Sequence, residues 1–261
     1  MIHEYPCDHG FNYFWQLLYF FKIGRIQKNM VTTLILLDFF LQIRDLLLII
    51  FDVEGVLYDE EYLPILAEKL NKEDEIWEIT KQGIQGKINW EEGLRTRVAA
   101  LKGLDEKICQ QVADNLPIMT GAKEACMALK AAGWKIMAVS GGFTLMMDRL
   151  QKELGLDHVF CNDLIFKDGK LDGVQINVDS DKSKSAKIKI AEWGEKKEDI
   201  VCVVDGANDI KLFDVCGLGI AYRAQDLVKD LATTTLEEKD LSKILDIINK
   251  HFKLELNTAA V

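Results

Sequence analysis

Three segments of the chain carry polar residues immediately after a short apolar run. They are Leu46–Phe51 with Asp52 and Glu54, Lys135–Val139 with Ser140-Gly141-Gly142, and Ile200–Val204 with Asp205 and Asp209. Runs that are apolar on both faces are typical of buried parallel strands. Because parallel strands bring their carboxyl ends to one edge of a sheet, we expect these polar groups to be neighbours there.

Such a group of residues suits phosphoryl transfer. A carboxylate can attack phosphorus and form an aspartyl-phosphate, and carboxylates also hold Mg²⁺. A hydroxyl and backbone N–H groups at a helix N-terminus, as expected at Ser140-Gly141, suit phosphate oxygens. Lys182 and Lys184, in the polar loop expected before a helix over Ala186–Trp193, could supply a positive charge.

Each segment also has an ordinary interpretation when it is taken alone. An acid after a strand is often a helix cap, Ser140-Gly141-Gly142 could be a simple turn, and most lysines between Lys182 and Lys189 are expected on the surface. The occurrence of polar groups after three successive strands favours a site instead. A serine hydrolase is disfavoured because Ala138 replaces the first glycine of G-x-S-x-G. The four histidines are too scattered for a zinc hydrolase.

Strands and helices alternate from Gly121 onward, which predicts an α/β fold with a mostly parallel sheet. An antiparallel hairpin is expected over Val159–Val178, turning at Asp168-Gly169. Residues 59–117 have a helical pattern throughout and are predicted to form a cap outside the sheet. In this cap Arg97 shares an apolar helical face with Trp90, so it could grip a carboxylate in a bidentate manner.

The composition is that of a globular protein, with 49% apolar and 28% charged residues. A net charge of −10 argues against a nucleic-acid partner. Six scattered cysteines without a C-x-x-C pattern indicate reduced thiols in a cytoplasmic protein. The sequence carries no signal for an oligomeric state.

Residues 1–45 form an N-terminal extension with three open interpretations. It could be a packed helical extension, an interfacial membrane anchor, or the product of a start assigned too far upstream. We favour the last, with the natural start at Met30 or somewhat later. A membrane span is disfavoured because the two apolar stretches, Phe11–Phe21 and Val31–Ile43, do not reach the roughly 18 uncharged residues that a span requires.

The chain from Leu46 to about Phe252 resembles the phosphoserine phosphatases of the haloacid dehalogenase superfamily. The resemblance rests on Asp52-x-Glu54-Gly-Val-Leu, Ser140-Gly-Gly-Phe, a lysine near Lys182, and Asp205-Gly-Ala-Asn-Asp209. It implies a Rossmann-like core over residues 46–58 and 118–252, an inserted helical cap over 59–117, and a tail over 253–261.

The resemblance also implies a role for each site residue. Asp52 would be the nucleophile and Glu54 the acid/base. Mg²⁺ would be held by the carboxylates of Asp52 and Asp205 and the Glu54 carbonyl, with Asp209 orienting them. The phosphate-binding residues would be Ser140, Gly141, Lys182 and Asn208, with Lys182 preferred over Lys184. The substrate-binding residues would be Glu61 for the amino group, Arg97 for the carboxylate, and Ile84 and Trp90 as walls.

The implied function is Mg²⁺-dependent hydrolysis of O-phospho-L-serine, a small phosphorylated metabolite, in the last step of serine biosynthesis. Two positions depart from the family, which usually has Asp at Glu54 and Gly at Val204. Glu is longer by roughly 1.5 Å, and misplacing a catalytic group by about 1 Å can cost about 10²-fold in rate. The alternatives are therefore phosphotransfer to homoserine, hydrolysis of another small phosphomonoester, or a non-catalytic phospho-ligand sensor.

Overall fold

The computed structural model describes residues 47–256, which lie within a unit formed by residues 45–261. The expectations for residues 1–45, including the start near Met30, and for residues 257–261 of the tail lie outside the described residues. Within residues 47–256, no helix is both long and apolar enough to cross a membrane.

A seven-stranded sheet forms the centre of the described chain, in the order β4-β3-β2-β1-β5-β6-β7. All neighbouring strands are parallel except β3 and β4. The strands are β1 (Leu48–Phe51), β2 (Lys135–Phe143), β3 (His158–Lys167), β4 (Lys170–Gln175), β5 (Ile200–Val204), β6 (Leu218–Tyr222) and β7 (Thr234–Leu236). The predicted α/β fold with a mostly parallel sheet is confirmed.

The central strand β1 is buried on both faces because all four of its residues are apolar. Leu48 and Ile50 belong to the core on one face of the sheet, and Ile49 and Phe51 to the core on the other. Helices that cover the first face are α9 (Lys182–Trp193) and α10 (Asp226–Leu231), and those that cover the second are α7 (Ala122–Ala131), α8 (Thr144–Leu154) and α11 (Ile244–Phe252). This burial on both faces explains why the strand reads as a continuous apolar run.

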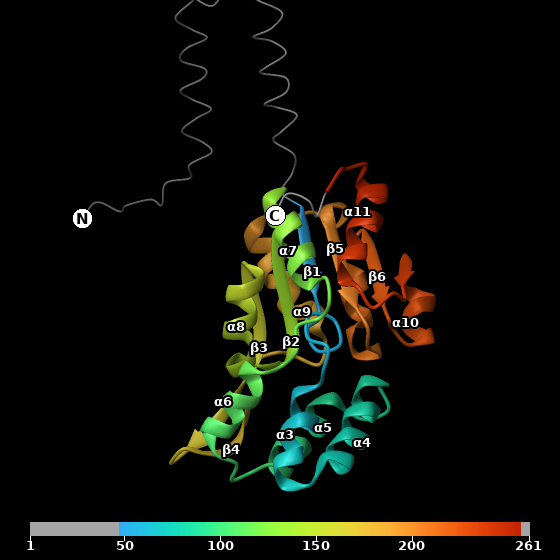
Figure 1. Ribbon diagram of the computed structural model, residues 1–261. Coiled ribbons are helices and arrows are strands. Elements are labelled where there is room, and N and C mark those ends of the chain that lie inside the picture. Colours follow the sequence, from blue (N-terminus) through green and yellow to red (C-terminus); the bar gives the residue numbers. More distant parts are fainter. Residues whose placement is uncertain (1–46, 257–261) are drawn as a thin grey trace, which may run out of the picture. The chain divides into compact units, whose positions relative to one another are not determined.

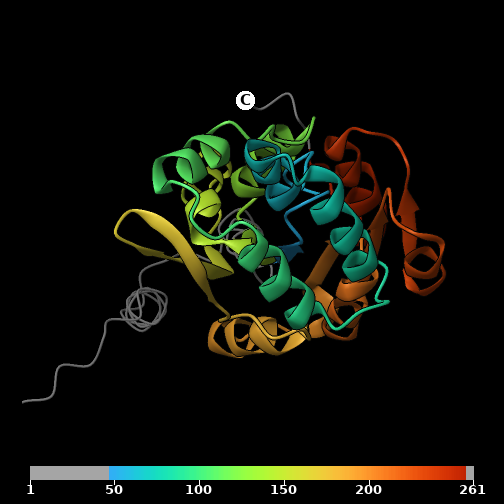
Figure 2. The same cartoon turned by 90° about the horizontal axis from the view of Figure 1, so that it is seen from below.

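Four helices lie between β1 and α7 in the sequence, within the predicted cap. They are α3 (Tyr62–Ala67), α4 (Glu73–Ile84), α5 (Trp90–Ala100) and α6 (Glu106–Asp114), with a short 3₁₀ turn η1 (Glu68–Leu70). Figure 1 shows α3, α4 and α5 beyond the carboxyl end of β1, and in Figure 2 they lie in front of it. Asn89 caps the start of α5, since its Oδ1 accepts a hydrogen bond from the Glu92 N–H at 3.0 Å.

The hairpin β3–β4 turns at Asp168-Gly169, as the sequence predicted. Both residues have positive φ, 51° and 72°, which is the backbone of a type I′ turn. The hairpin also touches the cap, because Leu171 accepts a hydrogen bond from the Gly103 N–H and donates one to the Leu104 carbonyl, both at 2.8 Å. The strand β7 was not predicted; it has only three residues.

Candidate active site

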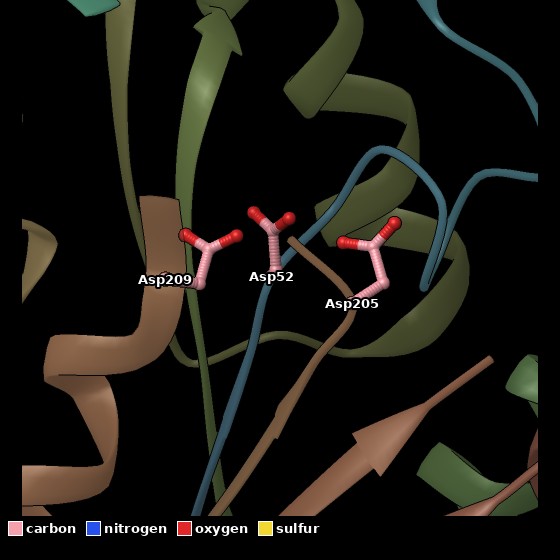
Figure 3. A group of neighbouring side chains, drawn as sticks. All are labelled: Asp52, Asp205 and Asp209. Carbon is pink, nitrogen blue, oxygen red and sulfur yellow. The ribbon is translucent and has the colours of Figure 1, made fainter. Parts of the chain in front are cut away.

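Three aspartates lie together at the carboxyl ends of the central strands. Asp52 follows β1, Asp205 follows β5, and Asp209 lies on the 3₁₀ segment η3 (Ala207–Val215). One carboxylate oxygen of each lies within 4.8 Å of the others, and Figure 3 shows Asp52 between the other two. The parallel pairing of β1 with β5 produces this arrangement, since the Asp52 N–H continues the ladder with a 3.0 Å bond to the Val203 carbonyl.

Lys182 forms ion pairs with two of these aspartates. Its Nζ lies 2.6 Å from Asp52 Oδ1 and 2.5 Å from Asp209 Oδ1. Burial lowers the pKa of the Lys182 ammonium, but the charges of Asp209 and Asp52 outweigh burial and leave this pKa raised. A permanent positive charge therefore stands beside Asp52.

The start of α9 places this lysine. Asp181 caps the helix by accepting a hydrogen bond from the Ser183 N–H, so Lys182 is the first helical residue. The expectation that Lys182 and Lys184 precede the helix in a loop is wrong for this reason. Lys184 Nζ instead pairs with Asp179 at 2.8 Å on the surface, where the Lys184 side chain is 61% exposed.

Ser140 and Gly141 lie at the irregular end of β2. The strand runs through them to Phe143, with a shift in its register against β3, and α8 begins at Thr144. Gly141 is therefore at a bulged strand end and not at the helix N-terminus that we expected. Ser140 Oγ accepts a hydrogen bond from the Gly142 N–H at 2.8 Å, and Asn162 Nδ2 donates to the Gly141 carbonyl at 2.9 Å.

Glu54 extends from the core to the beginning of the cap. Its Oε1 accepts a hydrogen bond from the Tyr62 N–H at 2.8 Å, at the start of α3. Burial raises the pKa of Glu54, and this hydrogen bond offsets only part of the increase. Gly55 has a φ of +82°, and any side chain there would overlap the carboxylate of Asp205. The close approach of these two segments therefore requires glycine.

One cavity contains ten of the predicted site residues. The core contributes Asp52, Glu54, Gly141, Lys182, Asp205 and Asn208, and the cap contributes Glu61, Ile84, Trp90 and Arg97. Ser140 and Asp209 lie behind this lining, each only 1% exposed. The structure thus brings together the twelve residues of the predicted site, whereas the other candidate lysine, Lys184, lies on the surface.

The cap side of the cavity contains both a cation, Arg97, and an acid, Glu61. Arg97 is buried, which lowers its pKa, while the carboxylates of Glu54 and Glu61 oppose this effect. Burial raises the pKa of Glu61 well above its usual value, and repulsion from Glu54 adds to the increase. Trp90 closes this side against the core, since a side chain on Gly141 would overlap the Trp90 indole.

A sequence model of the haloacid dehalogenase-like hydrolases matches residues 46–217 of the chain. The chain belongs to this family of hydrolases. It is 39% identical over 204 residues to the phosphoserine phosphatase of Methanocaldococcus jannaschii, covering 77% of this chain and 97% of that relative. With the phosphoserine phosphatase of Archaeoglobus fulgidus it is 36% identical over 208 residues, covering 78% of this chain but 60% of that relative.

Solved structures of the family agree with the fold. A phospho-aspartyl intermediate analogue of phosphoserine phosphatase superposes with a TM-score of 0.75 at 37% identity, covering 78% of this chain and 99% of the other. A substrate-bound phosphoserine phosphatase complex superposes with a TM-score of 0.75 at 36% identity, covering 78% and 99%. Both matches extend over nearly the whole of the solved chains.

The three aspartates of this family member suit a divalent cation. Burial and repulsion from Asp52 raise the pKa of Asp205 to about 8 and that of Asp209 well above its usual value. Lys182 supplies one positive charge for three carboxylates, so a dication would complete the neutralisation. Carboxylate oxygens are the ligands that Mg²⁺ prefers. Asn208 Oδ1 is also buried and has no hydrogen-bond partner within residues 47–256.

Five further residues line the cavity and were not predicted as site residues: Leu63, Thr80, Gly83, Leu94 and Phe143. Thr80 lies four residues after Ile76 and four before Ile84 on α4, so it shares their face of the helix. A polar residue at this spacing within an apolar face was the available signal. The same signal identified Arg97 on α5.

Proposed function

We propose that this protein is a Mg²⁺-dependent phosphatase that hydrolyses O-phospho-L-serine to L-serine and phosphate through an aspartyl-phosphate on Asp52. The observation that carries the proposal is a single cavity with two complementary ends. Asp52 and Lys182 lie at the core end, and Glu61 and Arg97 at the cap end. The first pair suits a phosphate, and the second suits the ammonium and carboxylate of an amino acid. The two relatives described above are phosphoserine phosphatases, which agrees with this substrate.

The first step is attack of an Asp52 carboxylate oxygen on phosphorus, which breaks the bond to the serine oxygen. Glu54 is proposed to donate a proton to that leaving oxygen, a role that suits the raised pKa of its carboxyl group. Deprotonated Glu54 then takes a proton from the water that hydrolyses the aspartyl-phosphate. One group thus serves as acid and then as base.

Four groups are proposed to hold the phosphate: Ser140, Gly141, Lys182 and Asn208. Lys182 is ion-paired with Asp52, so it would also orient the nucleophile. Asn162 and Ser140 fix the peptides around Gly141, which would leave the Gly141 N–H free for a phosphate oxygen.

The metal would be held by the carboxylates of Asp52 and Asp205 and by the Glu54 carbonyl, with Asp209 supporting them. When bound, Mg²⁺ neutralises the negative charge of the phosphate and its attacking carboxylate. At the cap end Arg97 would bind the substrate carboxylate and Glu61 its ammonium, between walls formed by Ile84 and Trp90.

A cytoplasmic location fits the state of the cysteines. Five of the six lie in the described region, and all five are free thiols. Free thiols are typical of a reducing compartment.

The proposal is tested with a panel of phosphomonoesters assayed in Mg²⁺. We expect phosphoserine to be the best substrate, and Asp52→Asn to lower phosphate release by about 10⁴-fold or more, since the covalent step loses its nucleophile. Turnover of other monoesters without turnover of phosphoserine would contradict the substrate, and full activity of Asp52→Asn would contradict the mechanism. Homoserine is added in parallel, because phosphohomoserine formation would reveal a transferase.

A further inference from the structure

Arg97 is held by two uncharged acceptors on the cap. Its Nε donates to the Gly93 carbonyl at 3.3 Å, and its Nη1 donates to Thr80 Oγ1 at 3.0 Å. A guanidinium has five N–H donors, so three remain, all on the two terminal nitrogens. A pair of N–H groups on these nitrogens is able to bind a carboxylate in a bidentate manner.

Thr80 can act only as an acceptor toward Arg97. Its hydroxyl proton is used in a 2.8 Å hydrogen bond to the Ile76 carbonyl, one turn earlier on α4. Thr80 as a whole is only 1% exposed, so its hydroxyl has little contact with solvent. The result is a directed chain from Arg97 through Thr80 to the backbone of α4.

An uncharged anchor matters because two acids lie near the guanidinium. Glu54 and Glu61 are the charged groups that act on Arg97, and an unanchored arginine could turn toward either of them. Pairing with a carboxylate of the protein would satisfy the terminal N–H groups and reduce their attraction for a substrate. Thr80 and the Gly93 carbonyl hold the arginine without neutralising it.

We propose that Thr80 is a positioning residue that orients Arg97 for the carboxylate of the substrate, and so sets the preference for phosphorylated amino acids over phosphomonoesters without a carboxylate. This inference rests on the proposed function and names a residue through which the selectivity of that site is achieved. Thr80 acts through Arg97 and takes no part in the phosphoryl transfer itself.

The test compares O-phospho-L-serine with O-phosphoethanolamine, which lacks only the carboxylate. In Thr80→Val, which keeps the shape and removes the hydroxyl, we expect KM for phosphoserine to rise about tenfold with a much smaller change in kcat. The ratio of kcat/KM for phosphoserine to that for phosphoethanolamine should fall by a similar factor. Thr80→Ser keeps the hydroxyl and should recover most of the ratio.

A second pair of variants covers the case in which valine disturbs folding. Thr80→Ser and Thr80→Ala both lose the methyl group and differ only in the hydroxyl, so Thr80→Ala should have the lower ratio. Equal losses of kcat/KM on both substrates would mean a merely structural role, and unchanged kcat/KM on both would mean no role; either result overturns the inference. Failure of the wild-type protein to hydrolyse phosphoserine overturns the proposed function instead, and is seen before any variant is compared.

Discussion

Glu54 illustrates how one longer side chain is accommodated at the residue scale. Its carboxylate reaches α3 and accepts the Tyr62 N–H at 2.8 Å, so the extra carbon–carbon bond is used to span from the core to the cap. The N–H at the beginning of a helix is a natural partner for an acid, since it has no partner within the helix. The same bond ties the proposed acid/base to the segment that carries Glu61 and the rest of the cap.

Two substitutions at Glu54 distinguish the role of its carboxyl group in proton transfer from the role of its side-chain length. Glu54→Gln removes the proton-transfer group, and we expect kcat for phosphoserine to fall by about 10²- to 10⁴-fold. Glu54→Asp keeps the acid but shortens it by roughly 1.5 Å, so a smaller loss of about 10²-fold is expected from misplacement. Steady-state phosphate release measures both. A Glu54→Asp variant that is faster than wild type would mean that the protein does not depend on the bond to Tyr62.

The sequence predicted the core residues of the site better than those of the cap. Asp52 and Asp205 could be placed because each ends a buried strand, and parallel strands must bring such ends together. The spacing of Thr80 marks it as a polar residue on an apolar helical face, but its contact with Arg97 could not be predicted, since it depends on how α4 packs against α5. That packing is set by many side chains of both helices and leaves no short pattern in the sequence.

At the scale of elements, Asn162 joins three segments that must act together. Its Nδ2 donates to the Gly141 carbonyl at 2.9 Å, and its Oδ1 accepts from the N–H groups of Asn177 and Val178 at 2.9 and 3.0 Å. Asn162 therefore links β3 to the end of β2 and to the chain that leads into α9 and Lys182. Its side chain is fully buried, so each of these bonds lacks competition from water.

Replacing Asn162 by Asp tests this link. The carboxylate can still accept from Asn177 and Val178, but it has no N–H for Gly141 and repels that carbonyl. We expect inhibition by inorganic phosphate to weaken by about tenfold or more, because an unpaired buried polar group costs about 1–3 kcal/mol. Inhibition constants for phosphate, with thermal denaturation in parallel, provide the measurement.

Asn177→Ala is the matched control, because the Asn177 side chain is exposed and contacts Asp163. It leaves the backbone N–H that Asn162 accepts, so phosphate inhibition should stay within about twofold of wild type, a loss of only about 0.4 kcal/mol. Equal weakening in both variants would show that the loop as a whole is sensitive, and not the bond to Gly141.

The elements themselves were predicted more accurately than their ends. The apolar runs fixed the position of β5 at Ile200–Val204, as observed. The start of α9 was placed four residues too late because a lysine-rich segment reads as a loop, while the Asp181 cap allows the helix to begin at Lys182. This difference matters for the site, because in the first turn of α9 the Lys182 side chain reaches Asp52, while the Lys184 side chain lies on the surface.

At the scale of the whole molecule, the site concentrates negative charge inside an already negative protein. The chain has a net charge of −10, and its cavity contains four carboxylates with Asp209 behind them, against Lys182 and Arg97. A phosphorylated substrate adds further negative charge. Binding of a divalent cation should therefore stabilise the fold as well as enable the reaction.

The metal dependence of stability should itself depend on pH. Without metal, the pKa of Asp205 is raised to about 8 in the folded protein, compared with about 3.9 in an unfolded chain. The folded state thus binds this proton more tightly, and its stabilising contribution is present at low pH and lost as pH rises through about 8. Mg²⁺ competes with the proton, so its binding strengthens over the same range.

We therefore expect the Tm difference between Mg²⁺ and EDTA to be small at pH 5.5 and to reach about 5 °C or more at pH 8, with the cation at about 100 times its Kd. Asp205→Asn removes the titrating ligand, so it should melt higher than wild type in EDTA at pH 8 and gain little from Mg²⁺. Scanning calorimetry at several pH values measures both effects. A Tm difference that is constant from pH 5.5 to 8 would mean that the cation does not displace protons from Asp205, and the ligand set would then have to be sought elsewhere.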